Sequence, residues 1–346
     1  MRPLKKLPLA FGLRRSGGET SPKKHRKIIQ NVIYLPKLAA NKMRRRHAAT
    51  PQPVVVEENT LVAKNTVSVP GYGAENLPSQ RLNWKLPETG PVCEAGEMQV
   101  YVSQDAEVIR AAQALRYQVF YEEMDAEPSP ENRALGLDVD KYDAICDHLI
   151  VLDRALPEGE QLVGCYRLLR GEVAMAHGGF YSAGEYDISE LMRIPPERLL
   201  ELGRSCVVET HRSKKTIQLL WRGITAYLTQ HDLTTLFGCA SFPGRDPEEH
   251  AEALSCLYHF NSGEETDPKV RALDHLHSEM NLMPKDDVNA RRALRNMPPL
   301  IKAYLRLGGV IGDGAVIDEQ FGTVDVFVAV HMEKVGSRYY SHFDKR

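Results

Sequence analysis

Residues 199–231 read LLELGRSCVVETHRSKKTIQLLWRGITAYLTQH. Residues 199–208 are mostly apolar and end in two β-branched valines, which predicts a buried strand. Residues 214–231 repeat apolar residues at helical spacing, which predicts an amphipathic helix. Charged side chains in an apolar strand are costly to bury without partners. Glu201 and Arg204 therefore form either a structural ion pair or part of an active site, and the stretch alone leaves both hypotheses open.

The segments on either side of this unit alternate between strand and helix patterns. A strand and a helix come first, then two strands separated by a turn, and after residue 231 a short buried strand, two helices and a hairpin around residues 321–322. This order predicts an α/β (α+β) fold, in which one mixed sheet carries helices on both faces. The segments are 98–103, 105–124, 147–153, 160–170, 234–241, 247–260, 298–309, 310–318 and 323–332.

The charge distribution divides the chain. Residues 1–50 hold 14 Lys and Arg but one acid, Glu19, whereas the remainder has 30 basic and 45 acidic residues. Pro, Gly, Ser and basic residues without sustained periodicity continue to residue 95. We therefore expect a basic, mostly disordered extension over 1–95, one folded domain over 96–335 and a C-terminal tail over 336–346.

One piece of the extension has apolar residues at helical spacing. Residues 27–35 predict a short amphipathic helix between two basic clusters. Such a helix can lie on an anionic membrane surface, where each basic residue adds roughly 1 kcal/mol of attraction. A solvated basic tail and an organelle-targeting peptide are alternatives that the sequence leaves open.

Cysteine usage and hydropathy predict the compartment. The six cysteines are scattered without metal-ligand spacing, and several lie in apolar strand patterns, where a reduced cysteine behaves as a small hydrophobe. No stretch approaches the ~18–20 apolar residues of a membrane span, and none has the pattern of a signal peptide. We expect a cytoplasmic protein, with peripheral attachment to the inner face of the cytoplasmic membrane as an open alternative.

Several large enzyme classes have no support in the sequence. There is no GxGxxG fingerprint, Walker loop, GxSxG elbow or HExxH motif. His148 and His211 are isolated, with no sign of a paired nucleophile. We therefore expect no resident cofactor, no metal and no nucleic-acid partner.

Charged residues at strand and helix edges are the remaining candidates for a site. Arg116 falls on the inner side of the first helix, and Arg167 lies inside an apolar strand. Glu201 and Arg204 are three apart, so in a regular strand they point to opposite faces. A bulge at Gly203 would bring them together. The full set is Arg116, Asp140, Asp143, Asp147, Arg167, Glu201 and Arg204.

Over residues 98–332 the order of several segments resembles the ornithine lipid-forming N-acyltransferases. Those enzymes are bacterial members of the GNAT acyltransferase superfamily and are related to the acyl-homoserine-lactone autoinducer synthases. The segments are LRYQVFYEEM, DKYDAICDHLIVLD, VGCYRLLR, ELGRSCVVETHR, LLWRGITAYL, LFGCASFPGRDP and PPLIKAYLRLGGVIGDGAVIDEQFGTVDVFV.

The resemblance implies a GNAT fold whose sheet splays between its fourth and fifth strands, here residues 199–208 and 234–241. The pantetheine arm of the acyl donor would lie in that split. The implied reaction transfers a 3-hydroxyacyl chain from acyl carrier protein, as co-substrate, to the α-amine of L-ornithine, giving lyso-ornithine lipid. The alternatives are an autoinducer synthase-like enzyme that acylates S-adenosylmethionine and a non-catalytic membrane-surface module.

A thioester donor needs no covalent nucleophile, but the amine must lose a proton to attack. Glu201 is the candidate base. The backbone N–H groups near Cys206 and Val207 are candidate oxyanion donors. The Cys206 thiol is expected to be a packing group, because an apolar neighbourhood makes a thiol inert. Tyr166 is one of several tyrosines that could protonate the leaving thiolate.

Ornithine has two ammonium groups and a carboxylate, so its site should contain both signs of charge. Asp140 and Asp143 are expected to hold the ammonium groups, and Arg116 or Arg204 the carboxylate, with Arg167 also at the substrate. The stretch THRSKKTIQ lacks the glycines of an acetyl-CoA-binding loop and is basic, which suits the single phosphodiester and acidic surface of a carrier protein. The expected donor-binding residues are Val208, Arg212, Lys214 and Lys215.

Overall fold

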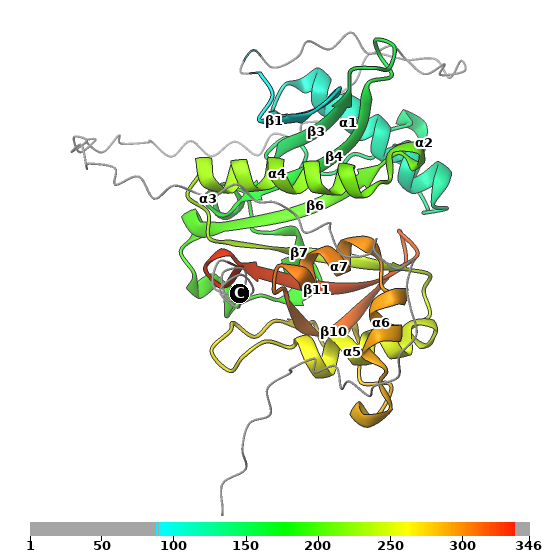
Figure 1. Ribbon diagram of the computed structural model, residues 1–346, viewed down its shortest axis with the longest axis vertical. Helices are drawn as coiled ribbons and strands as arrows, with labels where there is room; N and C mark the ends of the chain where they lie inside the picture. Colours follow the sequence, from blue (N-terminus) through cyan, green and yellow to red (C-terminus); the bar gives the residue numbers. More distant parts are fainter. Residues whose placement is uncertain (1–87, 89, 336–346) are drawn as a thin grey trace, which may run out of the picture. The chain divides into compact units, whose positions relative to one another are not determined.

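The computed structural model describes residue 88 and residues 90–335 (Figure 1). The strands are β1 Cys93–Ala95, β2 Met98–Ser103, β3 Asp147–Asp153, β4 Leu162–Arg170, β5 Tyr186–Asp187, β6 Leu199–Val207, β7 Thr235–Pro243, β8 Arg271–Ala272, β9 His277–Ser278, β10 Val310–Asp318 and β11 Thr323–His331. The α-helices are α1 Ala106–Tyr117, α2 Pro130–Leu135, α3 Gly171–Ala176, α4 Lys214–Gln230, α5 Ala251–Asn261, α6 Ala290–Asn296 and α7 Pro299–Arg306. Short turns of helix include η1 Gln118–Glu123, a π-helical continuation of α1, and the 3₁₀ turns η2 Tyr181–Gly184 and η5 Glu209–His211.

These strands form one mixed sheet in the order β1-β2-β3-β4-β6-β7-β11-β10-β8-β5, with β9 beside β10. Neighbours are antiparallel from β1 to β6 and from β7 to β10. The central pair, β6 and β7, is parallel and is joined by the helical crossover α4. The expected mixed sheet is therefore confirmed, as is the C-terminal hairpin.

Helices cover both faces of the sheet. Because alternate strand residues point to opposite sides, neighbouring residues of one strand pack against different helices. Leu149 and Val151 of β3 pack in the cluster that includes α4, α5 and α7. Ile150 and Leu152 pack on the other side with Val108 of α1. Figure 1 shows α4 beside β6 and α7 beside β11. We call these sides the α4 face and the α1 face.

Of the domain boundaries expected from the sequence, the described residues include the one between the extension and the folded domain. Residues 93–95, the end of the expected extension, form β1 and pair with β2. The Arg222 side chain of α4 donates to the Glu94 carbonyl, so the folded domain starts at least three residues earlier than expected. The rest of the extension, including the helix expected over 27–35, and the tail over 336–346 lie outside the described residues. No helix among the described residues is long and apolar enough to cross a membrane.

Candidate active site

The parallel strands β6 and β7 pair over three positions only and then separate. The pairs are Leu199 with Thr235, Leu200 with Leu236, and Glu201 with Phe237. We call the point where the strands part, just after the last of these pairs, the fork. A cavity of about 500 Å³ fills the split beyond it. Gly238 follows Phe237, and a Cβ there would lie 2.2 Å from the Leu202 carbonyl oxygen. The close approach at the fork therefore requires glycine.

A β-bulge redirects β6 just past the fork. Cys165 of β4 pairs with Cys206 and Arg167 with Gly203, so β6 has one residue more than β4 over this stretch. The extra residue is in the pair Arg204–Ser205, and Arg204 has a left-handed φ of 52°. The irregularity was expected at Gly203, where it would have used glycine's freedom. It lies one residue later, and an arginine adopts the strained conformation.

Glu201 lines the cavity at the fork. Its Oε2 accepts a hydrogen bond of 2.8 Å from the Tyr181 amide, and its Oε1 accepts bonds of 2.7 and 2.6 Å from the Ser182 amide and hydroxyl. Burial raises the pKa of Glu201, and the donors from Ser182 and Tyr181 offset part of that rise. The result is a buried carboxylate with a fixed orientation and a raised affinity for a proton.

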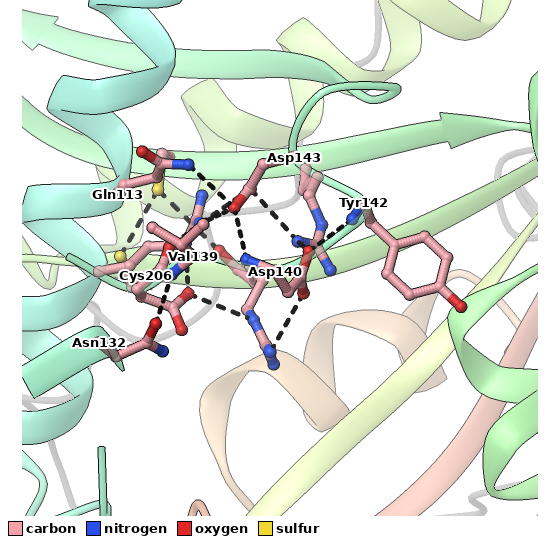
Figure 2. Close-up of polar contacts among 12 residues, drawn as sticks. Gln113, Asn132, Val139, Asp140, Tyr142, Asp143 and Cys206 are labelled. Atoms are coloured by element: carbon pink, nitrogen blue, oxygen red, sulfur yellow. Dashed lines mark hydrogen bonds and ion pairs between the residues drawn. The ribbon is translucent and has the colours of Figure 1, made fainter. Parts of the chain in front are cut away.

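Three aspartates and three arginines form a buried network behind the bulge (Figure 2). Arg116 contacts Asp138 at 2.6 Å and Asp143 at 2.8 Å, and Arg167 contacts Asp140 at 2.6 Å. Although burial opposes ionisation, Arg116 and Arg167 hold the pKa of Asp143 below its ordinary value. The equal numbers of formal charges make this arginine–aspartate network neutral. Its members are Arg116, Arg167, Arg204, Asp138, Asp140 and Asp143.

Arg204, like Arg167 of the same network, lines the cavity, where it lies beside Phe321 and Tyr181. It lies 3.3 Å from both Asp138 and Asp140. Its guanidinium carbon is 4.5 Å from the centroid of the Phe321 ring and 5.4 Å from that of Tyr181. Its Nε is buried without a hydrogen-bond partner. Ion pairs and two aromatic rings thus hold a planar cation at the cavity wall.

The alternation of the antiparallel ladder determines which backbone amide faces the split. The Val208 amide donates to Val163 of β4 at 3.0 Å. The Val207 carbonyl accepts instead from Arg212 Nε at 2.9 Å, so Val207 points away from β4. Because amides alternate along a strand, the Val207 N–H faces the split, whereas that of Cys206 faces β4. Val207 is therefore the better-placed of the two expected oxyanion donors.

The thiol of Cys206 is paired with another thiol. Its sulfur lies 3.6 Å from Cys165 Sγ, and both side chains are buried. The hydrogen bond with Cys165 and burial together raise the pKa of the Cys206 thiol well above its ordinary value. A thiol that resists ionisation is a poor nucleophile.

The loop from β6 to α4 presents basic side chains at a helix N-terminus. Ser213 caps α4 by accepting a hydrogen bond from the Thr216 amide at 3.2 Å. Arg212, Ser213 and Thr216 line the cavity, and Lys214 and Lys215 are exposed beside them. Backbone amides at a helix N-terminus, with added cationic side chains, bind phosphate groups.

The two ends of the cavity differ in character. On the α4 face it is lined by apolar residues of α4 and the start of α7, and by Tyr166, whose hydroxyl lies 2.7 Å from that of Tyr304. On the α1 face it is lined by Tyr181, Glu201 and Asp325. The apolar lining residues that α4 and α7 contribute are Ile217, Leu220, Trp221, Ile224, Pro299 and Leu300. The cavity therefore runs through the sheet, and its charged lining groups Glu201, Arg204 and Asp325 lie at the α1-face end.

Residues 115–222 match the family model described as an acetyltransferase (GNAT) domain. An L-ornithine N(alpha)-acyltransferase of Brucella abortus (strain 2308) is 51% identical over 251 residues, which cover 72% of this chain and 89% of that protein. One from Rhizobium meliloti (strain 1021) is 48% identical over 250 residues, covering 71% and 84%. The chain belongs to this acyltransferase family.

The strand order, the fork and the family match confirm the GNAT fold expected from the sequence. Among solved structures, the CoA-dependent acyl-homoserine lactone synthase BjaI with SAM and isopentyl-CoA is 14% identical, with a TM-score of 0.38, and covers 69% of this chain and 87% of that one. Family membership also confirms that the protein is an N-acyltransferase. The alternative of a non-catalytic membrane-surface module has no support.

Half of the residues expected in the acyltransferase's site line its cavity. These are Arg167, Glu201, Arg204, Cys206, Val207 and Arg212. The others, Arg116, Asp140, Asp143, Val208, Lys214 and Lys215, lie outside the lining. Arg116 and Asp143 are 1% and 3% exposed and bind one another. Asp143 also contacts Arg167 at 3.3 Å, and Arg116 shares Asp138 with Arg204, so both belong to the network behind the two arginines that line the cavity.

Sequence reasoning missed a second group of acids in the acyltransferase. Asp325 of β11 lines the cavity, is 7% exposed, and has an Oδ1 without a hydrogen-bond partner. Burial, with a smaller contribution from Asp318, raises the pKa of Asp325 to about 6. Burial and the charge of Asp325 raise the pKa of Glu185 to about 7. The signal was available, since TVDVFVAV buries one acid in an otherwise apolar strand.

The acyltransferase's geometry assembles the elements of acyl transfer to an amine. The Glu201 carboxylate, with its raised pKa, can accept the amine's proton. The Val207 amide, which faces the split, can stabilise an oxyanion, and the buried Tyr166 can donate to a leaving thiolate. Burial raises the pKa of Tyr166, so its hydroxyl stays protonated at neutral pH. Among the described residues no group of three or more His, Cys, Asp or Glu side chains is placed to hold a metal ion.

Proposed function

We propose that this acyltransferase transfers a 3-hydroxyacyl chain from acyl carrier protein to the α-amine of L-ornithine and so forms lyso-ornithine lipid. The observation that carries the proposal is a cavity with a charged end at Glu201 and Arg204 and an apolar end at α4 and α7. An amino acid fits the first and an alkyl chain the second. The names of the relatives support L-ornithine as acceptor. The 3-hydroxyacyl donor and the lipid product rest on the resemblance of the sequence segments.

The acceptor would bind on the α1 face. The guanidinium of Arg204 suits the α-carboxylate, because a planar cation pairs with a carboxylate through two hydrogen bonds. With an ordinary α-amino pKa near 8, only a minority of the amine is neutral at pH 7. Glu201, fixed by the Tyr181 and Ser182 donors, would take its proton as the nitrogen attacks.

The thioester would lie in the split, with its carbonyl oxygen toward the Val207 amide. Attack by the amine nitrogen forms the C–N bond and places negative charge on that oxygen. Collapse of the tetrahedral intermediate breaks the C–S bond, and the Tyr166 hydroxyl can donate a proton to the departing thiolate. Because the thioester is already activated, the proposal includes no resident cofactor.

The donor's carrier would contact the loop before α4. That loop offers Arg212, Lys214 and Lys215 and contains no glycine. A carrier protein offers one phosphodiester and an acidic surface, and basic side chains at a helix N-terminus complement both. Peripheral contact with an anionic membrane is a separate proposal that rests on residues 23–46, which lie outside the described part of the chain.

The decisive experiment supplies purified full-length enzyme with 3-hydroxyacyl-acyl carrier protein and either L-ornithine or S-adenosylmethionine. The expected product is N-acyl-ornithine, detected by mass spectrometry, with acyl-CoA a poorer donor at equal concentration. The HxxxxD string of the sequence, His148–Asp153, lies in strand β3 with His148 buried and both residues outside the cavity lining, so the purified enzyme should stop at the lyso product. Formation of acyl-homoserine lactone without acyl-ornithine would instead establish the autoinducer synthase alternative.

A further inference from the structure

Asp325 lies on the face of β11 that also carries the buried Phe327. Its register partners are Ser241 of β7 and Val316 of β10, so it sits in the middle of the sheet. It is 7% exposed, lines the cavity, and its Oδ1 has no hydrogen-bond partner. A buried acid with an unused oxygen is costly unless a donor or cation arrives.

The neighbouring groups do not supply that cation. No salt bridge among residues 88 and 90–335 includes Asp325. Burial is the largest influence on the pKa of Asp325 and raises it, with a smaller rise from Asp318. The Ser241 and Thr323 hydroxyls and the charge of Arg204 favour the ionised form, but they offset only part of that rise. The titratable groups that interact with Asp325 from the elements around it are Glu185, Tyr186, Arg204, Cys239 and Asp318. Apart from Arg204 these groups are acids or neutral hydroxyl and thiol groups, so the position lacks a positive partner of its own.

A short chain of contacts connects this position to the proposed base. Ser182 Oγ is 2.6 Å from Glu201 Oε1 and 3.8 Å from Cys239 Sγ. Cys239 Sγ in turn donates to Glu185 Oε2 at 3.2 Å, and Glu185 interacts with Asp325. The charged end of the cavity thus has two acidic poles, one at Glu201 and one at Asp325. An acceptor with a second ammonium group on its side chain matches two such poles.

We propose that Asp325, with Glu185 behind it, forms the subsite that binds the side-chain ammonium of the acceptor. This inference rests on the proposed function, since it assigns a residue to one group of the proposed acceptor. Asp325 would then determine selectivity for a diamino acid over an acceptor with an apolar side chain. Glu201 would keep the separate task of deprotonating the α-amine.

The test compares L-ornithine with L-norvaline, which has the same carbon chain without the side-chain amine. Values of kcat/KM for both acceptors are measured for the wild-type enzyme, Asp325→Asn and the control Asp313→Asn, which removes a half-exposed acid of β10. The preference is the ratio of kcat/KM for ornithine to that for norvaline. Because a charge-assisted hydrogen bond to a buried group is strong, we expect this ratio to be about tenfold to hundredfold larger in the wild type than in Asp325→Asn. The loss should appear in the KM for ornithine, and the control should keep the wild-type preference.

An unchanged ornithine preference in Asp325→Asn would overturn the inference. An equal fall in kcat for both acceptors would also overturn it and would make Asp325 a proton acceptor instead. If Asp325→Asn does not fold, the wild-type preference should fall as pH decreases through about 6, the pKa of Asp325, and a flat profile would refute the subsite.

Failure of the proposed function has a different signature. The wild-type enzyme would then acylate neither ornithine nor norvaline. In that case thermal unfolding decides the subsite: ornithine should raise the unfolding temperature of the wild type more than norvaline does, and this difference should vanish in Asp325→Asn. Equal shifts in both proteins would reject the subsite.

Discussion

Ser182 Oγ donates a hydrogen bond of 2.6 Å to Glu201 Oε1 and thereby joins the turn η2 to the strand at the fork. The bond is one of three that orient the carboxylate, and it is the only one of the three made by a side chain. Its removal tests whether Glu201 acts as a base, because the bond lowers the pKa of Glu201 against the effect of burial.

Ser182→Ala should raise the pKa of Glu201 further. A base must be ionised to work, so the acidic limb of the kcat/KM profile should move to higher pH, with little change at its alkaline end. Glu201→Gln should fold and lose about 10²–10⁴ in kcat. The control is Ser189→Ala, which changes an exposed serine seven positions after Ser182. A pH profile that is the same in Ser182→Ala and the control would remove Glu201 from the role of base.

Gly238→Ala should destabilise the protein. The new Cβ would meet the Leu202 carbonyl oxygen at 2.2 Å, and neither backbone can yield without opening the fork. Overpacking of this kind costs about 1–3 kcal/mol of unfolding free energy, which urea unfolding measures. Gly203→Ala is the matched control, because nothing lies within 4 Å of the point that its new Cβ would occupy. Equal stability of the two variants would contradict the close approach.

Asp325→Asn should stabilise the unliganded protein in a pH-dependent way. The folded-state pKa of about 6 is above the unfolded value of 3.8, so the favourable effect of the protonated carboxyl is complete below pH 4 and is lost as pH rises through 6. A shift of about two units corresponds to about 3 kcal/mol. The unfolding free energy of the variant should therefore exceed that of the wild type by about 2–3 kcal/mol at pH 8, and the two values should match near pH 4. Denaturant unfolding at both pH values measures the difference, and a constant gap would argue against the titration of Asp325.

Lys214→Ala combined with Lys215→Ala should weaken use of the carrier protein. Both lysines are exposed at the start of α4, where they would meet an acidic partner. The KM for acyl carrier protein should rise about fivefold to tenfold at low salt, and the gap from the wild type should shrink as salt screens the contact. A 3-hydroxyacyl-pantetheine donor, which has neither the protein nor the phosphate, is the control. If its KM rises as much, the lysines do not act through the carrier.

Cys206→Ala should retain activity within about twofold. The thiol is buried against Cys165 and its pKa is raised, so it supplies packing and no nucleophile. The loss of a buried sulfur should cost about 1–2 kcal/mol of stability. Abolished turnover in a folded variant, or an acyl-enzyme at this position by mass spectrometry, would require a covalent mechanism.

The sequence was sufficient to predict the order of strands and helices. Apolar residues repeated every two or every 3.6 positions indicate which face of a strand or helix is buried. The sequence of α4 has the helical pattern over its whole length. The fork between β6 and β7 came from the resemblance, because the separation of two strands depends on packing between distant segments. Gly238 illustrates this point: its need to be glycine arises from contact with Leu202, 36 positions earlier in the chain.

The site was harder to predict, because pairing in space decides which charges are available. Arg116 and Asp143 have the composition expected of substrate ligands, yet they neutralise one another. Ser182, which orients Glu201, lies in a segment whose sequence shows no functional pattern. Asp325 was detectable as an acid in an apolar strand, as Arg167 was, but its lack of a cationic partner became visible only with Glu185 and Asp318 in place.

The fork is closed at one end only. Beyond the pair Glu201–Phe237, β6 and β7 have no ladder between them. Under the proposed function, a long-chain donor attached to its carrier protein would enter the split from this open end without the breaking of any strand pair. The proposed product, with its polar head on one face of the sheet and its acyl tail on the other, would leave along the strands through the same opening. Turnover on such a product thus requires no strand to unpair.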